Sequence, residues 1–337
     1  MKKYNVCVVG ATGLVGGEMI KTLFKRNFPL NNLKLLATKK SAGIKIETPQ
    51  GVLTVEEIKD SSFENMEIVL FSGGEIASEE YAPKAAASNC IVIDNSATFR
   101  MAKDVPLIVP EVNPDSIFNH KGIIANPNCS TIQMVAALKP IYDNAGIKRI
   151  VVSTYQSVSG TGKAAVEELN LQTESISKGQ EPLISVYPYQ IAFNVIPQIG
   201  SFGEDGYSSE EKKMIEETKK IFGDDNIKIS ATTVRIPVKR GHCEAVNIET
   251  TIKISAEQVK NLLKKQNGIK VLDDPANSIY PTPMICEEAD YVFVGRIRED
   301  TSIETGIDMW IVSDNLLKGA ALNAIQIAEL LIEKSLI

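Results

Sequence analysis

The start of the chain carries a pattern that few folds accommodate. An apolar run from Asn5 to Val9 meets the glycine turn 10–16, Gly-Ala-Thr-Gly-Leu-Val-Gly, after which apolar residues recur at helical spacing. A buried strand that ends in a glycine turn and opens a helix is typical of a parallel sheet with helical crossovers. Glycine allows the backbone to approach a phosphate, and a helix start favours an anion. The turn therefore predicts a nucleotide site, although its GxxGxxG spacing also fits a purely structural turn.

Further apolar runs extend this pattern and then give way to a different one. Short runs separated by segments long enough for crossovers lie at 33–37, 68–71, 91–93 and 107–109. They predict a doubly wound parallel sheet, class α/β. Longer, alternating strands follow at 149–155, 227–238 and 245–254. Alternation predicts a mostly antiparallel sheet in a second, α+β domain, with one face packed and the other covered or wet.

The chain length agrees with two domains, since 337 residues exceed the usual size of one core. We expect residues 1–127 to form the first domain. A last apolar helix, 316–332, is expected to pack back on it, so 316–337 joins that domain and 128–315 forms the second. Helices are also predicted after Gly162 and over 208–222, where Ser208 and Glu211 form a capping box.

Composition and charge argue against several classes of binding partner. The net charge of −6 argues against nucleic acid or an anionic membrane as the main partner, and no apolar segment reaches the roughly 20 residues of a membrane span. Five cysteines, an odd count without a CxxC pair, fit a reducing compartment and exclude a zinc knuckle. We therefore expect a cytoplasmic protein with no metal.

One cysteine stands where a loop ends and a helix begins. The stretch 126–131 reads Asn-Pro-Asn-Cys-Ser-Thr, and apolar residues then recur at helical spacing up to a stop at Gly146. A helix N-terminus stabilises an anion and lowers the pKa of a thiol. Cys129 is therefore a candidate nucleophile, against the alternative of a buried, inert thiol.

A thiol nucleophile needs a group that takes and returns a proton, and histidine is the usual choice. The chain has only two histidines. His120 lies in a sequence typical of a surface turn, whereas His242 follows Gly241 at the start of a predicted strand. His242 is therefore the favoured base, with a structural histidine as the alternative.

The end of the second predicted strand bears on the cofactor. An NAD site usually presents an acid there for the ribose hydroxyl, but this chain reads Thr-Lys-Lys-Ser at 38–41. Two lysines and a serine suit a 2′-phosphate and indicate NADP. A solvated pair of loop lysines is the alternative.

These residues together resemble the aspartate-semialdehyde dehydrogenase family from end to end. The resemblance rests on separated motifs in the right order: GATGLVG at 10–16, NCST at 128–131, QSVSG at 156–160, RIPV before Gly241-His242, and DNL before KGA at 318–320. It implies a homodimer with an NADP-binding, Rossmann-type first domain and a second catalytic and dimerisation domain.

The resemblance also implies roles for individual residues. Cys129 would attack L-aspartyl-4-phosphate and release phosphate, NADPH would reduce the thioester, and His242 would serve as acid and base in releasing L-aspartate 4-semialdehyde. Gln156 would orient the acyl group, Arg235 the α-carboxylate and Glu210 the α-ammonium. The phosphate would be bound by Arg100, Asn128 and Lys213. The cofactor would contact Gly10, Thr12, Gly13, Leu14, Val15, Lys39, Ser41, Ser72, Gly73, Ser159, Gly160 and Asn315.

Several alternatives stay open. Glu210 and Lys213 lie three apart on a predicted helix and could form a plain surface ion pair, and Arg100 could be an ordinary surface arginine. Leu317 stands where the family often has arginine, and 71–74 departs from the usual Ser-Ala-Gly. Rival functions are N-acetyl-glutamyl-phosphate reductase, glyceraldehyde-3-phosphate dehydrogenase, and a nucleotide-binding regulatory protein without chemistry.

Overall fold

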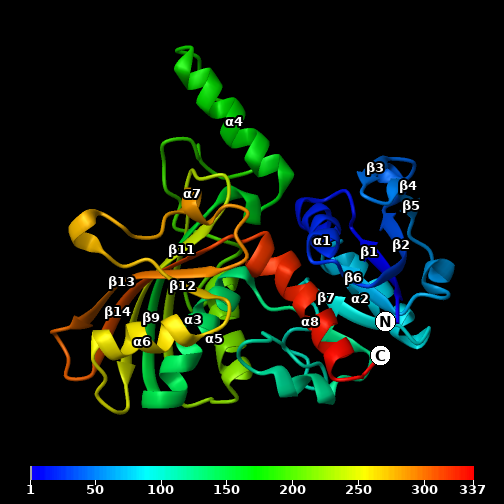
Figure 1. The fold of residues 1–337 in the computed structure, drawn as a ribbon. Helices are drawn as coiled ribbons and strands as arrows, with labels where there is room; N and C mark the ends of the chain where they lie inside the picture. The colour runs from blue at the N-terminus through cyan, green and yellow to red at the C-terminus, as the bar shows by residue number, and fades with distance from the viewer. Residues whose placement is uncertain (1) are drawn as a thin grey trace. The chain divides into compact units, whose positions relative to one another are not determined.

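The computed structural model describes residues 2–337 and divides them into two units (Figure 1). The first comprises Met1–Asn128 with Ala320–Ile337, and the second Cys129–Gly319. Residues 316–319, which we expected in the first domain, group with the second unit. The carboxylate of Asp314 accepts the N–H groups of Leu316 and Leu317, and its carbonyl accepts that of Gly319, which holds this turn on the second unit.

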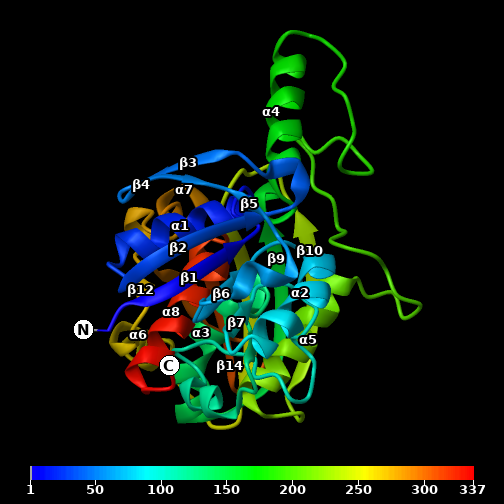
Figure 2. The same cartoon turned by 90° about the vertical axis from the view of Figure 1, so that its right-hand side faces the viewer.

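The first unit contains the predicted parallel sheet, in the order β5-β2-β1-β6-β7-β8, and every pairing within it is parallel. Figure 2 shows β1, β2 and β6 running side by side. The strands are β1 (Tyr4–Val9), β2 (Leu30–Ala37), β5 (Glu56–Glu57), β6 (Ile68–Phe71), β7 (Ile91–Asp94) and β8 (Ile123–Ala125). Its helices are α1 (Leu14–Lys25), α2 (Glu75–Ala87) and α8 (Leu322–Glu333), and β3 (Lys45–Thr48) and β4 (Gly51–Thr54) form a separate hairpin.

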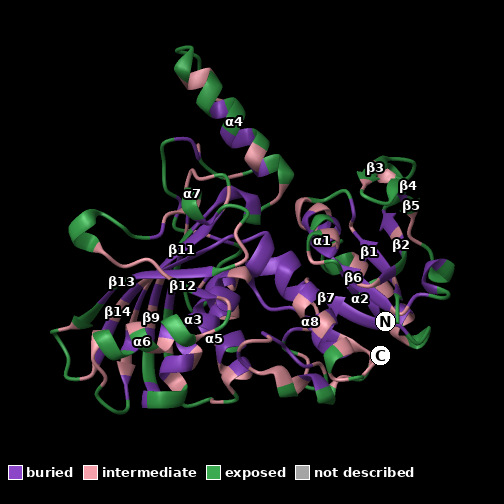
Figure 3. Cartoon of the chain, in the orientation of Figure 1, coloured by how far each residue is buried: buried purple, intermediate pink, exposed green. Residues whose placement is uncertain are grey.

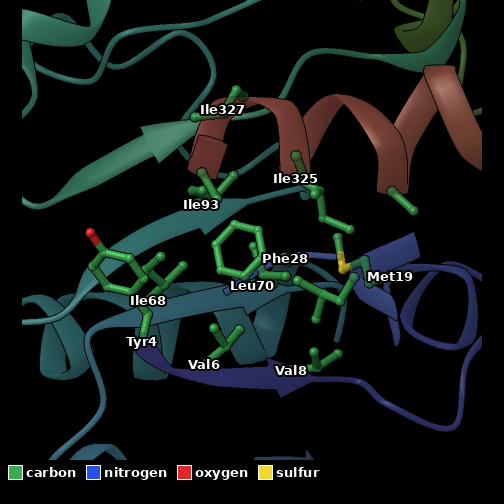
Figure 4. Packing of buried hydrophobic residues seen from close by; sticks show 14 of the residues in the cluster. Tyr4, Val6, Val8, Met19, Phe28, Ile68, Leu70, Ile93, Ile325 and Ile327 are labelled. Atoms are coloured by element: carbon green, nitrogen blue, oxygen red, sulfur yellow. The ribbon is translucent and has the colours of Figure 1, made fainter. Parts of the chain in front are cut away.

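The last helix packs on the first unit, as predicted. Ile325 and Ile327 of α8 lie in one buried cluster with Val6 and Val8 of β1 and with Met19 of α1 (Figure 4). The prediction of a single helix over 316–332 is wrong, however, because a π-helical turn, Leu317–Ala321, precedes α8.

The predicted strand at 107–109 is also wrong. Pro106 and Pro110 flank the run, and proline lacks the N–H that a ladder needs. The side chain of Asn113 hydrogen-bonds the N–H of Val109 and the carbonyl of Leu107, so only an isolated bridge to Ala125 remains. The edge of the sheet is β8 instead.

The second unit is built on a mixed sheet in the order β10-β9-β11-β14-β13-β12. The central pairings are antiparallel, as expected, while β10 with β9 and β12 with β13 pair in parallel. The strands are β9 (Ile147–Gln156), β10 (Lys228–Arg235), β11 (His242–Thr250), β12 (Ile269–Val271), β13 (Val292–Asp300) and β14 (Gly306–Ser313). The helices are α3 (Cys129–Ala145), α4 (Lys163–Ser177), α5 (Ser209–Phe222), α6 (Ala256–Lys265) and α7 (Pro283–Cys286).

Alternate residues along the strands of this sheet differ in burial, so its two faces differ. Gln156 and Thr154 of β9 are buried on the face that α3 covers, whereas Tyr155 between them and Ser153 before them are more exposed. Helix α5 has the predicted capping box at Ser208 and ends at Gly223, whose φ of 65° is left-handed. Helix α4 stands away from its sheet and carries a largely exposed surface (Figure 3). No helix among residues 2–337 is long and apolar enough to cross a membrane.

Candidate functional site

The glycine turn of the first unit is shaped by close backbone packing. Gly10 has a φ of +82°, and a Cβ there would lie 2.6 Å from the backbone of Ser72. A Cβ on Gly16 would lie 2.2 Å from the carbonyl oxygen of Gly10. Gly13 is the N-cap of α1, which begins at Leu14, so the first N–H groups of the helix follow an exposed loop. This tight turn at a helix start fits the phosphates of a dinucleotide.

The other cofactor residues predicted in this unit lie at neighbouring strand ends. Ser72 and Gly73 follow β6, and the Ser72 hydroxyl donates to the carbonyl of Val9, the last residue of β1 (2.9 Å). Thr12 lies in the glycine turn and Val15 on the first turn of α1. All of these groups follow the carboxyl ends of adjacent parallel strands.

The predicted 2′-phosphate residues follow the next strand. Lys39, Lys40 and Ser41 form a 3₁₀ turn directly after β2, and both lysines are exposed. Their position at this strand end suits a ribose, and their exposure also suits a solvated pair.

Arg100 is not an ordinary surface arginine, since only 7% of it is exposed. Its Nε donates to the carbonyl of Asn126 and its Nη2 to that of Asn95, both at 2.9 Å. The Asn126 side chain accepts a hydrogen bond from Asn323 (2.7 Å). Arg100 is thus fixed on the loop that leads to Asn128, the residue before the cysteine.

Cys129 is the first residue of α3, as the sequence predicts. It is partly exposed, while the other four cysteines are buried. Burial raises the pKa of Cys90 to about 11 and that of Cys243 to about 12, which keeps these thiols protonated. Gly319 lies against the nucleophile, since a Cβ there would be 2.8 Å from the Cβ of Cys129. The helix start favours a thiolate at Cys129 alone among these thiols.

His242 begins β11 and is fully buried. The N–H of Ser157 donates to its Nδ1 (3.0 Å), so a neutral ring carries its proton on Nε2. Burial, and secondly the charge of Arg235, lower its pKa to about 3. Nε2 has no hydrogen-bond partner within residues 2–337, which leaves a buried N–H donor at the site.

Gln156, Glu210 and Lys213 form one cluster. The Gln156 amide accepts a hydrogen bond from Thr154 (3.0 Å) and donates to Glu210 (3.1 Å), which lies 3.6 Å from the Lys213 ammonium. Only 6% of Glu210 is exposed, so the alternative of a plain surface ion pair is wrong. The cluster places an amide, a carboxylate and an ammonium close together.

Arg235, the last residue of β10, lies beside the histidine. Its Nη1 donates to the carbonyl of Ser157 (2.6 Å), and its Nε has no partner in the described part of the chain. A Cβ on Gly160 would lie 3.1 Å from that Nη1 and 3.2 Å from Nε2 of His242. Gly160 therefore packs closely against both groups, and a side chain at this position would press on them.

Asn315 fixes the turn that carries His242. Its Oδ1 accepts the N–H of Gly241 (2.8 Å) and the hydroxyls of Ser157 and Ser159 (3.2 Å each). The adjacent Asp314 pairs with Arg240 at 2.7 Å. The sequence analysis assigned no role to Ser157, Asp314 or Arg240. Their position inside recognised motifs was the only available signal, because their contacts span distant parts of the chain.

Two models of known domains match the chain. They are described as the NAD-binding domain of semialdehyde dehydrogenase, over residues 5–120, and the dimerisation domain of semialdehyde dehydrogenase, over residues 138–318. Together with the glycine turn and the thiol at a helix start, they define a semialdehyde dehydrogenase.

Comparison with individual proteins identifies the family within this class. Aspartate-semialdehyde dehydrogenase of Aquifex aeolicus is 54% identical over 99% of both chains, and that of Bacillus subtilis is 49% identical over 99% of both. A solved structure of aspartate semialdehyde dehydrogenase II from Vibrio cholerae, complexed with ASA, is 46% identical, covers 99% of both chains and has a TM-score of 0.97. The chain belongs to the aspartate-semialdehyde dehydrogenase family, which confirms the resemblance drawn from its motifs.

Proposed function

We propose that this enzyme catalyses the reversible, NADP-dependent reductive dephosphorylation of L-aspartyl-4-phosphate to L-aspartate 4-semialdehyde through a thioacyl intermediate on Cys129. The arrangement of the second unit carries this proposal. A partly exposed thiol begins a helix, and a buried histidine, an amide, an acid and an arginine are clustered in the same unit. These groups supply a nucleophile, a proton donor and anchors for an amino acid.

The chain's own residues perform the acyl transfer. The Cys129 thiolate attacks the acyl carbon, and phosphate leaves with its charge bound by Arg100, Asn128 and Lys213. Gln156 directs its amide at the acyl group, and N–H groups at the start of α3 stabilise the oxyanion. His242, which we propose as the general acid and base, hydrogen-bonds the hemithioacetal oxygen through Nε2–H, and the collapse re-forms the C=O bond and releases the Cys129 thiolate. Arg235 binds the α-carboxylate as a planar fork, and Glu210 binds the α-ammonium.

The cofactor we propose is NADP, whose reduced form would supply the hydride when bound. The first unit offers its glycine turn (Gly10, Thr12, Gly13, Leu14, Val15), the strand-end residues Ser72 and Gly73, and the 2′-phosphate residues Lys39 and Ser41; Ser159, Gly160 and Asn315 belong to the second unit. In support, a related solved structure of the Candida albicans enzyme is described as with NADP, at 27% identity and a TM-score of 0.77.

We further propose a homodimer formed through the second unit. The segment after α4 exposes large apolar side chains, among them Leu183, Tyr189 and Phe193, the last 74% exposed. Glu168 and Gln172 of α4 hydrogen-bond the backbone at 185–186 and 191–192, so this segment is ordered without a partner to hold it. Ordered, exposed apolar surface on a domain described as a dimerisation domain suits a second copy of the chain. Phe193→Glu should shift the sedimentation coefficient to that of a monomer.

We place the reaction in the cytoplasm, in the biosynthesis of lysine through diaminopimelate, threonine, methionine and isoleucine. None of the five cysteines forms a disulfide within residues 2–337, which supports a reducing compartment.

The decisive test compares two semialdehydes. Phosphate-dependent reduction of NADP should proceed with L-aspartate 4-semialdehyde and at least about tenfold less well, by kcat/KM, with N-acetyl-glutamate semialdehyde, because a neutral amide cannot pair with the Glu210 carboxylate as an ammonium does. Glu210→Gln should weaken use of aspartate semialdehyde mainly through KM. Equal use of both substrates, or no effect of Glu210→Gln, would contradict this assignment. Reduction without phosphate would contradict the phosphorylating reaction.

A further inference from the structure

Two buried polar side chains, Gln133 and Glu244, follow the thiol and the histidine on the same helix and the same strand. Glu244 follows His242 by two positions on β11, so both side chains point to the same face of the sheet. Gln133 follows Cys129 by four positions on α3, so both share one face of the helix. Glu244 and Gln133 are each fully buried. The Cys129 helix and the His242 strand thus each carry a buried polar side chain to which the proposed reaction assigns no role.

The surroundings of Glu244 do not suit a charge. Its neighbours across the sheet are Thr154 of β9 and Ile311 of β14, neither of which is charged. Neither carboxyl oxygen has a hydrogen-bond partner within residues 2–337. Burial raises the pKa of this carboxyl well above its usual range, and the Gln133 amide beside it lowers that pKa only in part. An isolated buried carboxylate costs several kcal/mol, so the neutral acid is the stable form.

A neutral Glu244 could donate the hydrogen bond that the Gln133 side chain lacks. A protonated carboxyl carries one O–H donor, and the amide oxygen of Gln133 is a buried acceptor without a partner among the described residues. The amide nitrogen of Gln133 meanwhile lies 3.5 Å from the backbone carbonyl oxygen of His242. An acid that donates to Gln133 Oε1 would fix the amide and direct its N–H groups at that carbonyl.

We propose that Glu244 is held as a neutral acid and that it and Gln133 act as a positioning pair, which sets the first turn of the Cys129 helix against the His242 strand. This inference rests on the proposed roles of Cys129 and His242. The pair touches no substrate and acts through the placement of two reacting groups, where a misplacement of about 1 Å can cost a hundredfold in rate.

The protonation state is tested by infrared spectroscopy of the intact enzyme at neutral pH. The wild-type spectrum minus that of Glu244→Gln should show the carbonyl stretch of a protonated carboxylic acid, shifted in heavy water. The control is Glu168→Gln, another buried acid, whose carboxylate accepts hydrogen bonds from Ser185. That substitution should leave the band in place. A difference spectrum with carboxylate bands would overturn the proposal, and this result does not depend on which reaction the enzyme catalyses.

The positioning role is tested by matched variants. Glu244→Gln keeps a neutral donor and should retain kcat within about threefold, whereas Glu244→Met and Gln133→Met should each lower kcat at least about tenfold with KM nearly unchanged. The double variant should be no worse than either single one if the two residues act as a unit. The rate of Cys129 alkylation by iodoacetamide should fall in parallel, which reports on the pair even if aspartate semialdehyde is not the substrate. Wild-type kcat in Glu244→Met, or equal losses in the Gln and Met variants, would refute the pair.

Discussion

The two sheets place functional groups in different ways. In the first unit the parallel strands are buried on both faces, and the candidate cofactor residues lie in loops beyond the strand ends, such as Gly10 after β1 and Ser72 after β6. In the second unit, Gln156, Arg235 and His242 are themselves strand residues on the face that α3 covers. Loops offer backbone N–H groups to a phosphate, whereas strands hold side chains in fixed positions for chemistry.

Removal of the nucleophile should have the largest effect. Cys129→Ser should lower kcat by at least about a thousandfold, because a serine hydroxyl has no comparable anionic fraction at neutral pH. Most of the proposed cofactor residues lie in the other unit, so cofactor binding should persist, as fluorescence titration with NADPH would show. The same separation predicts that one equivalent of iodoacetamide abolishes activity and that substrate protects. Full activity of a protein labelled at Cys129 would overturn the proposed chemistry.

Two glycine substitutions, one in each unit, should change different kinetic constants. Gly319→Ala places a methyl group 2.8 Å from the Cβ of Cys129 and should lower kcat by about a hundredfold. Gly10→Ala meets the Ser72 backbone at 2.6 Å with a left-handed φ, and should instead raise KM for the cofactor.

Gly17→Ala is the matched control, because a Cβ there meets no neighbour within 4 Å. It should leave both constants unchanged. If Gly10→Ala lowered kcat and spared the cofactor KM, the division of labour between the two units would be wrong.

The same contrast explains what the sequence revealed. Strands β1 and β6 and the start of α3 were predicted because apolar periodicity, the glycine turn and the proline before Cys129 are local signals. Strands β13 and β14 were not predicted, since charged residues such as Arg298 and Asp308 interrupt their apolar alternation. The acid Glu210 meets Gln156 only through packing of α5 on β10, and Ser157 reaches His242 across a separation of 85 residues. No local pattern encodes such contacts.

A smaller effect should come from the lysines after β2. NADP should be favoured over NAD by about one to three kcal/mol, or roughly 5 to 150-fold in kcat/KM, because charge-assisted hydrogen bonds recognise the 2′-phosphate. The double substitution Lys39→Ala and Lys40→Ala should remove most of this preference and leave kcat with NAD unchanged. Substitution of Lys45, an exposed lysine on β3, serves as the charge control. Equal use of both cofactors by the wild type would return the two lysines to a solvated pair.

The last predicted effect concerns stability and tests whether the buried histidine of the second sheet is neutral. Unfolded His242 takes up a proton near its ordinary pKa of 6.5, whereas the folded ring stays neutral down to about pH 3. Acid therefore favours the unfolded chain. The stability that this ring contributes is complete above pH 6.5 and is lost as the pH falls toward 3, by up to about 1.4 kcal/mol per pH unit.

Urea unfolding at about pH 7 and about pH 5 measures this effect. The free energy of unfolding should fall less between the two pH values in His242→Asn than in the wild type. His120→Asn is the control, because burial also lowers the pKa of that partly exposed ring but by less. If wild type and His242→Asn lost equal unfolding free energy between about pH 7 and about pH 5, the folded ring would take up its proton at the ordinary pKa. Burial would then not be what keeps His242 neutral.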